Sequence, residues 1–276
     1  MSAGRRGVLA SLASLLGGCS PAALLNATVP QRGYSRETDL AFGSDPRQRL
    51  DLYRPGRPAE RSCTVVFFYG GSWETGRKAD YLFVGQALAA AGHTAIVPDY
   101  RVWPEVRFPA FVEDGATAVR WVADRGEGRP LVVMGHSAGA HIALMLATHT
   151  PYLAEAGVER GALAGAIGVA GPYDFLPLTS PRLVEIFGAR DNPATQPITF
   201  ARAPLPPALL IHGLADRTVL PRNSERLAAA WRRAGAPVDL RLYPDVDHVD
   251  SIAAMAGLLR GRAPTRDDVT AWLAQR

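Results

Sequence analysis

This chain of 276 residues has few cysteines, few long apolar runs and little excess of one charge. Cys19 and Cys63 are its only cysteines, which excludes a fold held together by several disulfides. The formal net charge is +4, and a chain beginning at Cys19 would lose Arg5 and Arg6 and carry +2. Because no basic cluster is interleaved with aromatic residues either, the sequence predicts no nucleic-acid partner. The length fits one α/β domain or two small ones.

The N-terminal residues have the features of an export signal. An arginine pair, 5–6, precedes the apolar stretch 8–16. This stretch is too short to cross a bilayer, which needs about 20 residues. We therefore predict a signal peptide over 1–18. The arginine pair also resembles a twin-arginine export signal, although any signal peptide can carry two arginines.

The sequence LGGC at 16–19 resembles the lipobox of bacterial lipoproteins, in which the signal is removed before a cysteine that then carries a lipid. We therefore expect lipidation of Cys19 and a lipid-anchored tether over 19–36. Ser20 after the cysteine resembles sorting to the outer membrane. A disulfide between Cys19 and Cys63 is the alternative for an exported protein. Without that disulfide, Cys63 is expected to be a small buried residue, because it begins an apolar strand.

Short apolar runs alternate with segments of helical spacing along most of the chain. We expect strands at 50–53, 65–69, 94–97, 131–134, 166–170, 208–211 and 238–242. We expect helices at 81–91, 111–123, 141–147, 224–234 and 266–274. This alternation predicts an α/β fold with a mostly parallel sheet of about eight strands, covered by helices on both faces, in a domain spanning 37–276.

One pentapeptide, GHSAG at 135–139, has the form G-x-S-x-G. It directly follows the apolar run 131–134 and precedes the expected helix at 141–147. A strand, a sharp turn and a helix form the context in which this motif presents a reactive serine. The turn strains the serine backbone and pushes the hydroxyl out above the sheet, and the two glycines let strand and helix approach closely. The pattern predicts Ser137 as a nucleophile.

A serine hydroxyl needs a base to take its proton and an acid to orient that base. In enzymes with this motif the chain order is serine, acid, histidine. His248 is predicted as the base, because it lies in a loop after the strand at 238–242, at the carboxyl edge of the sheet. Asp216 is predicted as the acid, because it follows the strand at 208–211. Asp174 is the alternative acid.

The loop after the strand at 65–69 reads YGGSW. Two adjacent glycines let backbone N–H groups approach a developing negative charge closely, as an oxyanion hole requires. The amides expected to form this hole are those of Gly70, Gly71, Ser72 and Ala138.

The proline-rich stretch 172–207 interrupts the alternation of strands and helices. It lies between two expected strands, at the sheet edge where ligands bind in such folds. We expect a small lid there, with a plain long loop as the alternative. Trp73 and Trp103 are expected to form walls of a substrate pocket, with Phe175 and Phe187 as further candidates.

These motifs together resemble the α/β-hydrolases, and more narrowly the carboxylesterases of the hormone-sensitive-lipase and kynurenine-formamidase-like branches. The resemblance runs from about Leu50 to His248, through YGGSW at 69–73, PDYR at 98–101, FP at 108–109 with ED at 113–114, GHSAGAH at 135–141, and His212-Gly213 with Asp216 and Val219. Tyr69 stands where these families usually have histidine, and Ser72 where the lipase branch has a third glycine. The resemblance implies no metal and no organic cofactor.

The residues and the resemblance predict a serine carboxylic ester hydrolase that acts on small to medium acyl esters through an acyl-enzyme, with 37–276 as its catalytic domain. An amidase, formamidase or peptidase using the same triad is one alternative, and a non-catalytic surface protein is another. The expected partners are a small-molecule ester and, through a lipid at Cys19, a membrane. We expect an exported lipoprotein facing the periplasm or in the outer membrane, with a soluble periplasmic or secreted protein as the alternative.

Overall fold

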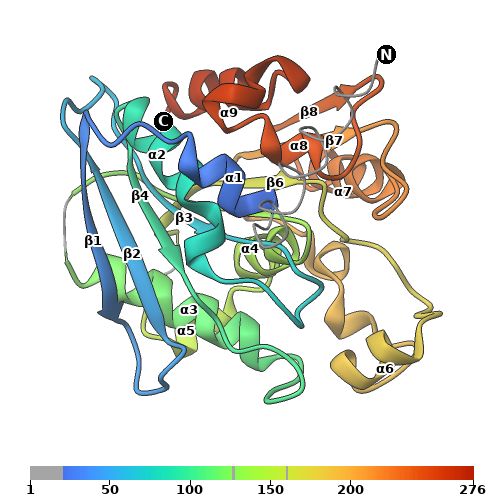
Figure 1. The fold of residues 1–276 in the computed structure, drawn as a ribbon. Helices are drawn as coiled ribbons and strands as arrows, with labels where there is room; N and C mark the ends of the chain where they lie inside the picture. The colour runs from blue at the N-terminus through green and yellow to red at the C-terminus, as the bar shows by residue number, and fades with distance from the viewer. Residues whose placement is uncertain (1–20, 126–127, 160) are drawn as a thin grey trace, which may run out of the picture.

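The computed structural model describes residues 21–125, 128–159 and 161–276, which fold around one eight-stranded sheet (Figure 1). The predicted signal peptide and Cys19 lie outside these ranges. The strands are β1 (Tyr34–Ala41), β2 (Arg49–Pro55), β3 (Thr64–Phe68), β4 (Thr94–Pro98), β5 (Leu131–His136), β6 (Leu163–Val169), β7 (Ala208–Gly213) and β8 (Val238–Tyr243). Their order is β1-β2-β4-β3-β5-β6-β7-β8. The β1–β2 and β2–β4 pairs are antiparallel and all other pairs are parallel, which confirms the predicted mostly parallel sheet.

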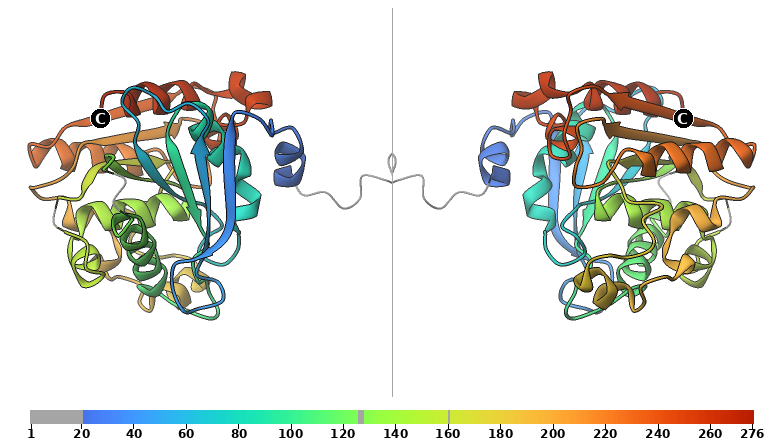
Figure 2. Two further views of the ribbon diagram at one scale, coloured as in Figure 1. Left: turned by 90° about the vertical axis from the view of Figure 1, so that its left-hand side faces the viewer. Right: turned by 90° about the vertical axis from the view of Figure 1, so that its right-hand side faces the viewer.

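Helices cover both faces of the sheet (Figures 1 and 2). They are α1 (Pro21–Ala27), α2 (Leu82–Ala90), α3 (Ala110–Ala123), α4 (Ala138–Thr148), α5 (Pro151–Glu155), α6 (Pro181–Phe187), α7 (Arg222–Arg233), α8 (Asp250–Ala253) and α9 (Thr265–Leu273), with 3-10 turns η1 (Lys78–Tyr81), η2 (Pro193–Thr195), η3 (Pro197–Phe200) and η4 (Gly257–Arg262). Within β6, Gly168 lies against Leu144 of α4 and Gly165 against Trp272 of α9, so these two helices lie on opposite faces. No helix in the described ranges is both long enough and apolar enough to cross a membrane.

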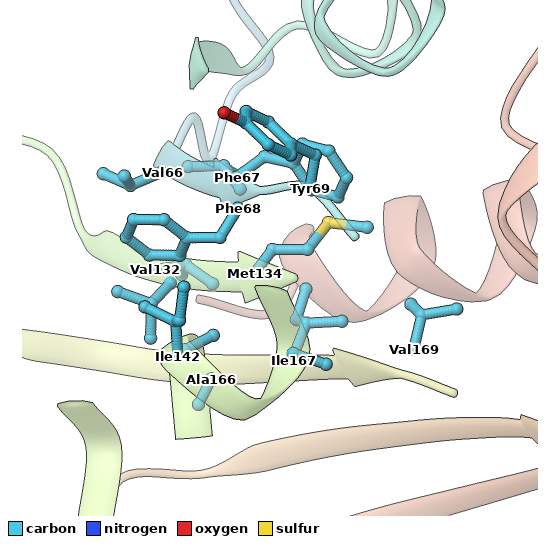
Figure 3. Close-up of a cluster of buried hydrophobic side chains, with 14 of the residues drawn as sticks. Val66, Phe67, Phe68, Tyr69, Val132, Met134, Ile142, Ala166, Ile167 and Val169 are labelled. Atoms are coloured by element: carbon cyan, nitrogen blue, oxygen red, sulfur yellow. The ribbon is translucent and has the colours of Figure 1, made fainter. Parts of the chain in front are cut away.

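The core lies where the central strands meet the helices. Every residue of β3 and β5 is buried, as expected for strands covered on both faces. Figure 3 shows side chains of β3, β5 and β6 packed together with Ile142 of α4. Cys63, just before β3, is fully buried and its thiol is free, as predicted for a small core residue.

The segment expected to be a tether, 19–36, is ordered against the domain over its described part. It contains α1 and the first residues of β1. Asn26 donates a hydrogen bond to the carbonyl of Ala79 (2.7 Å) and accepts one from the amide of Phe83 (3.2 Å). Sequence reasoning missed β1 because most of its side chains are polar and exposed, as an edge strand with one neighbour allows.

The stretch 172–207 leaves the sheet after β6 and returns at β7, and it contains α6, η2 and η3. Two of its aromatic rings reach the loop that follows β3. The ring centres of Phe187 and Phe175 lie 4.8 Å and 6.1 Å from that of Trp73. The insertion therefore packs against the loop for which the sequence predicts an oxyanion hole.

Candidate active site

Ser137 lies in a sharp turn between β5 and α4. Its backbone has φ 54° and ψ −123°, a conformation that residues other than glycine rarely adopt. A side-chain carbon on Gly135 would lie 2.1 Å from the carbonyl oxygen of Gly139, and one on Gly139 would lie 2.1 Å from that of Phe68. Backbone packing therefore requires both glycines of the motif. The Ser137 side chain remains half-buried at the edge of the sheet.

The predicted base and acid reach Ser137 from two later loops. His248 Nε2 lies 3.0 Å from Ser137 Oγ, although the two residues are 111 positions apart in the chain. His248 Nδ1 lies 2.7 Å from Asp216 Oδ2. Asp216 follows β7 and His248 follows β8, and these strands run parallel to β5 in the same sheet. All three residues therefore meet at the carboxyl edge, where ligands bind in folds of this type.

The other carboxylates near this edge have different partners. Asp174, the alternative acid, pairs with Arg226 at 2.9 Å. Asp247, next to His248 in the chain, accepts two amide hydrogens of its own loop at 2.8 Å and 2.9 Å. Asp216 is thus the carboxylate that contacts the His248 ring.

Asp216 is only 2% exposed and is surrounded by donors. Its Oδ1 accepts the amide hydrogens of Thr218 (2.8 Å) and Val219 (2.9 Å). Its Oδ2 faces His248 and lies 3.2 Å from Nε2 of His212. Burial alone would raise the pKa of Asp216, but hydrogen bonds from His212, His248 and Val219 outweigh it and hold this pKa well below its usual range. Asp216 is therefore ionised at neutral pH.

Two further histidines contact this arrangement, and sequence reasoning gave neither a role. His212 is fully buried, with Nε2 2.8 Å from the carbonyl oxygen of Val219 and Nδ1 2.7 Å from Ser224 Oγ. His136 Nε2 lies 3.1 Å from the carbonyl oxygen of His248. Contacts between distant loops leave no spacing pattern in a sequence. The sequence signal that could have pointed to them is their position at the carboxyl ends of strands, because His136 ends β5 and His212 is the next-to-last residue of β7.

The loop after β3 passes directly beside the elbow serine. A side-chain carbon on Gly70 would lie 3.0 Å from the Cβ of that serine. Gly71 and Ser72 both have positive φ, 131° and 55°. Ala138 is the first residue of α4, where amides have no acceptor within the helix.

Trp73, predicted as a pocket wall, is the centre of a packed aromatic cluster and is 4% exposed. The rings in contact with it belong to Phe111, His141, Phe175 and Phe187. The ring of Trp103, the second predicted wall, is instead covered by the guanidinium of Arg182 at 3.6 Å. The cluster joins the loop after β3 to α3, α4 and the insertion.

The described residues also form a cavity that is separate from this site. A cavity of about 600 Å³ lies between the end of α4, α5 and the start of β6, and none of the three residues Ser137, Asp216 and His248 lines it. No group of three or more His, Cys, Asp or Glu side chains within the described ranges is arranged to hold a metal ion.

Comparison with known proteins gives relatives that are esterases. The chain is 29% identical to the probable isoprenylcysteine alpha-carbonyl methylesterase of Oryza sativa subsp. japonica over 79% of this chain and 59% of that protein. It thus spans less than two thirds of the length of the first curated relatives it matches. An esterase of Thermogutta terrifontis, solved with propionate bound, is 27% identical, with a TM-score of 0.70 over 89% of this chain and 96% of that one. A truncated carbohydrate esterase from gut microbiota has a TM-score of 0.76 at 20% identity, over 89% of this chain and 98% of that one.

The mostly parallel eight-stranded sheet, together with these structural neighbours, defines an α/β-hydrolase. The narrower assignment comes from the family comparison. The chain belongs to the BD-FAE family, whose model matches residues 50–231. The matched range contains Ser137 and Asp216 and ends before His248.

Proposed function

We propose that this protein is a serine carboxylesterase that hydrolyses small to medium acyl esters through an acyl-enzyme. One observation carries the proposal: Ser137 Oγ, His248 and Asp216 form a continuous series of contacts at 3.0 Å and 2.7 Å. The esterase relatives and the family match support the same class of reaction.

The reaction begins with removal of the serine proton. Ser137 donates its hydroxyl hydrogen to His248 Nε2 while its oxygen attacks the ester carbonyl carbon. His248 becomes a cation, which Asp216 stabilises because its own donors keep it ionised. The imidazolium then gives the proton to the leaving alcohol, and an acyl-serine remains. Water then gives a proton to the same histidine while its oxygen attacks the acyl carbon. The imidazolium returns this proton to Ser137 Oγ as the acyl–serine bond breaks, which releases the acid and restores the serine.

The negative charge that develops on the carbonyl oxygen needs fixed donors. The amides of Gly71 or Ser72 and of Ala138 are assigned this role, since both segments adjoin the elbow serine. Each such donor contributes on the order of 3 kcal/mol to the stability of the transition state.

The preference for small to medium acyl groups rests on the aromatic cluster. Trp73 and Phe187 are 4% and 3% exposed, so their rings fill the space between the loop after β3 and the insertion. Bulky side chains that are already packed leave less room for a long acyl chain.

Turnover of 4-nitrophenyl acetate, butyrate and octanoate by wild-type protein and by Ser137→Ala tests this proposal. We expect turnover to fall with acyl length in the wild type. We expect Ser137→Ala to lower kcat at least about 10⁴-fold, because the members of such a triad act as a unit. The unfolding midpoint should stay close to that of the wild type, since alanine removes only one half-buried oxygen.

The same measurement separates the alternatives. Persistent turnover by Ser137→Ala would contradict the assignment of the nucleophile. Wild-type protein that cleaves 4-nitroanilides but none of the esters would be an amidase. A folded protein inactive on both would favour a substrate outside these series or a non-catalytic role.

A further inference from the structure

The backbone carbonyl of His248 is held by two buried side chains. His136 Nε2 lies 3.1 Å from this oxygen, and Ser251 Oγ donates to it at 2.7 Å. His136 is 5% exposed and Ser251 is fully buried. The first residue belongs to β5, directly before Ser137, and the second to α8, directly after the His248 loop. The proposed base is therefore fixed through its main chain as well as through its ring.

The ring of His136 acts here as an uncharged donor. A carbonyl oxygen only accepts hydrogen bonds, so Nε2 must carry the hydrogen and Nδ1 must lack one. Nδ1 is buried, has no hydrogen-bond partner and lies beside Gly70. Burial, and secondarily the His248 ring with its centre 4.8 Å away, lower the pKa of His136 to about 3.

We propose that His136 is a positioning residue, which ties the backbone of His248 to the strand that carries Ser137 and so sets the approach of His248 Nε2 to Ser137 Oγ. The role rests on the esterase function proposed above. The loop of His248 has an earlier anchor, where the amide of Ala215 donates to the carbonyl of Val246 at 3.1 Å. That anchor lies two residues before His248, whereas the His136 contact is made at His248 itself.

A positioning role and an electrostatic role of His136 predict different effects of its substitution on the pH dependence of activity. The ionisable groups that face His248 are Asp216 from the β7–α7 loop, His212 behind that carboxylate, and His136 from β5. The carboxylate of Asp247, on the same loop, is engaged by backbone amides. Replacing His136 by an uncharged amide therefore removes no charge near His248 at the working pH. The pH at which activity is lost on the acidic side of the profile, its acidic limb, should therefore be the same as in wild type.

The test compares His136→Gln with His136→Asn. A glutamine amide nitrogen reaches about as far as Nε2 and can donate to the His248 carbonyl, whereas the shorter asparagine falls short of it. We expect His136→Asn to lower kcat and kcat/KM equally, by about 100-fold, as a small displacement of a catalytic group does. We expect His136→Gln to restore turnover to within about threefold of wild type, and both variants to keep the wild-type acidic limb.

Two further variants serve as controls. His93→Gln changes an equally buried histidine that accepts the amide hydrogen of Cys63, remote from the site in the chain, and should leave kcat unchanged. Ser251→Ala removes the second donor to the same carbonyl and should lower kcat in the same direction as His136→Asn. Unfolding midpoints of all variants separate loss of fold from loss of positioning.

Several outcomes would overturn the positioning role. They are wild-type kcat in His136→Asn, equal losses in the asparagine and glutamine variants, and a shifted acidic limb in either. Should the asparagine variant fail to fold, a glutamine variant that folds and loses more than about tenfold in kcat would still overturn it. Wild-type turnover by Ser137→Ala would instead remove the proposed function, whereas an inactive Ser137→Ala beside a fully active His136→Asn would remove only the positioning role.

Discussion

At the residue scale, this protein buries several imidazoles whose Nε2 atoms face backbone carbonyls. His141 is fully buried, and its Nε2 lies 2.8 Å from the carbonyl oxygen of Thr195. His136 and His212 face backbone carbonyls in the same way. Burial lowers the pKa of His141 to about 4 and that of His136 to about 3. The rings of His136 and His141 therefore stay uncharged at a pH where an exposed histidine would already be protonated.

The lowered pKa values predict loss of stability in mild acid. Below about pH 6.5 the unfolded chain takes up protons at His136 and His141, while the folded protein does not until the pH approaches 4 or below. The contribution of these two histidines to the free energy of unfolding is therefore fully present above about pH 6.5. It should fall by about 1.4 kcal/mol for each pH unit and each histidine as the pH drops toward 4. Urea unfolding at pH 7, 6 and 5 measures this slope.

One substitution checks the origin of that slope. His141→Gln keeps an amide donor near the Thr195 carbonyl but cannot titrate. It should remove about 1.4 kcal/mol per pH unit from the dependence. A slope equal to that of wild type would show that His141 is not a source of the acid sensitivity.

At the element scale, the close packing of the start of α4 against the end of β3 determines where the serine lies. Gly139 packs its α-carbon against the backbone of Phe68 and Tyr69, both within 2.4 Å of where a side-chain carbon would lie. Backbone atoms of a central strand cannot move aside as the end of a flexible side chain can. The elbow and the loop after β3 therefore keep a fixed separation.

Gly139→Ala should consequently destabilise the fold strongly. The added methyl group overlaps main-chain atoms, and we expect a loss of about 3 kcal/mol or more in the free energy of unfolding. Gly261→Ala is the matched control, because no atom lies within 4 Å of its added carbon. That variant should stay within about 0.5 kcal/mol of wild type. Equal unfolding midpoints for the two variants would disprove the packing argument.

The elements recoverable from the sequence were those with a strong apolar pattern. The run 65–69 predicted β3, and the spacing in 111–123 predicted α3 to within one residue. β1 carries no such pattern, since its polar side chains face solvent and only its backbone pairs with β2. The short α5 and α8 likewise have too few residues to show a period. Local periodicity reports burial over several turns; β1 and α5 bury few side chains, whereas α8 is mostly buried but too short to show a period.

The candidate site shows the same division. Ser137, Asp216 and His248 could be chosen from motif and chain order, and the structure brings them together. The contacts of His136 and His212 could not be foreseen, because each joins a strand end to a loop that is adjacent only after folding.

At the scale of the whole molecule, the histidines fall into a buried group and a partly exposed group. Four of the six, His93, His136, His141 and His212, are buried. Only two histidines have partly exposed side chains: His149, whose ring centre lies 3.9 Å from that of Phe200, and His248, at the proposed site. The interior imidazoles are thus closed to reagents that the folded protein meets in solution.

This distribution makes the protein selective toward chemical labelling. An acylating reagent directed at histidine, such as diethyl pyrocarbonate, should modify His149 and His248 and leave the four buried rings untouched. In a His149→Gln variant, loss of turnover should then match the incorporation of one label per molecule, as followed by mass spectrometry. Labelling of a buried ring in the folded protein would contradict this expectation. The burial of most histidines thus allows a reagent of low intrinsic specificity to act as a titrant for a single side chain.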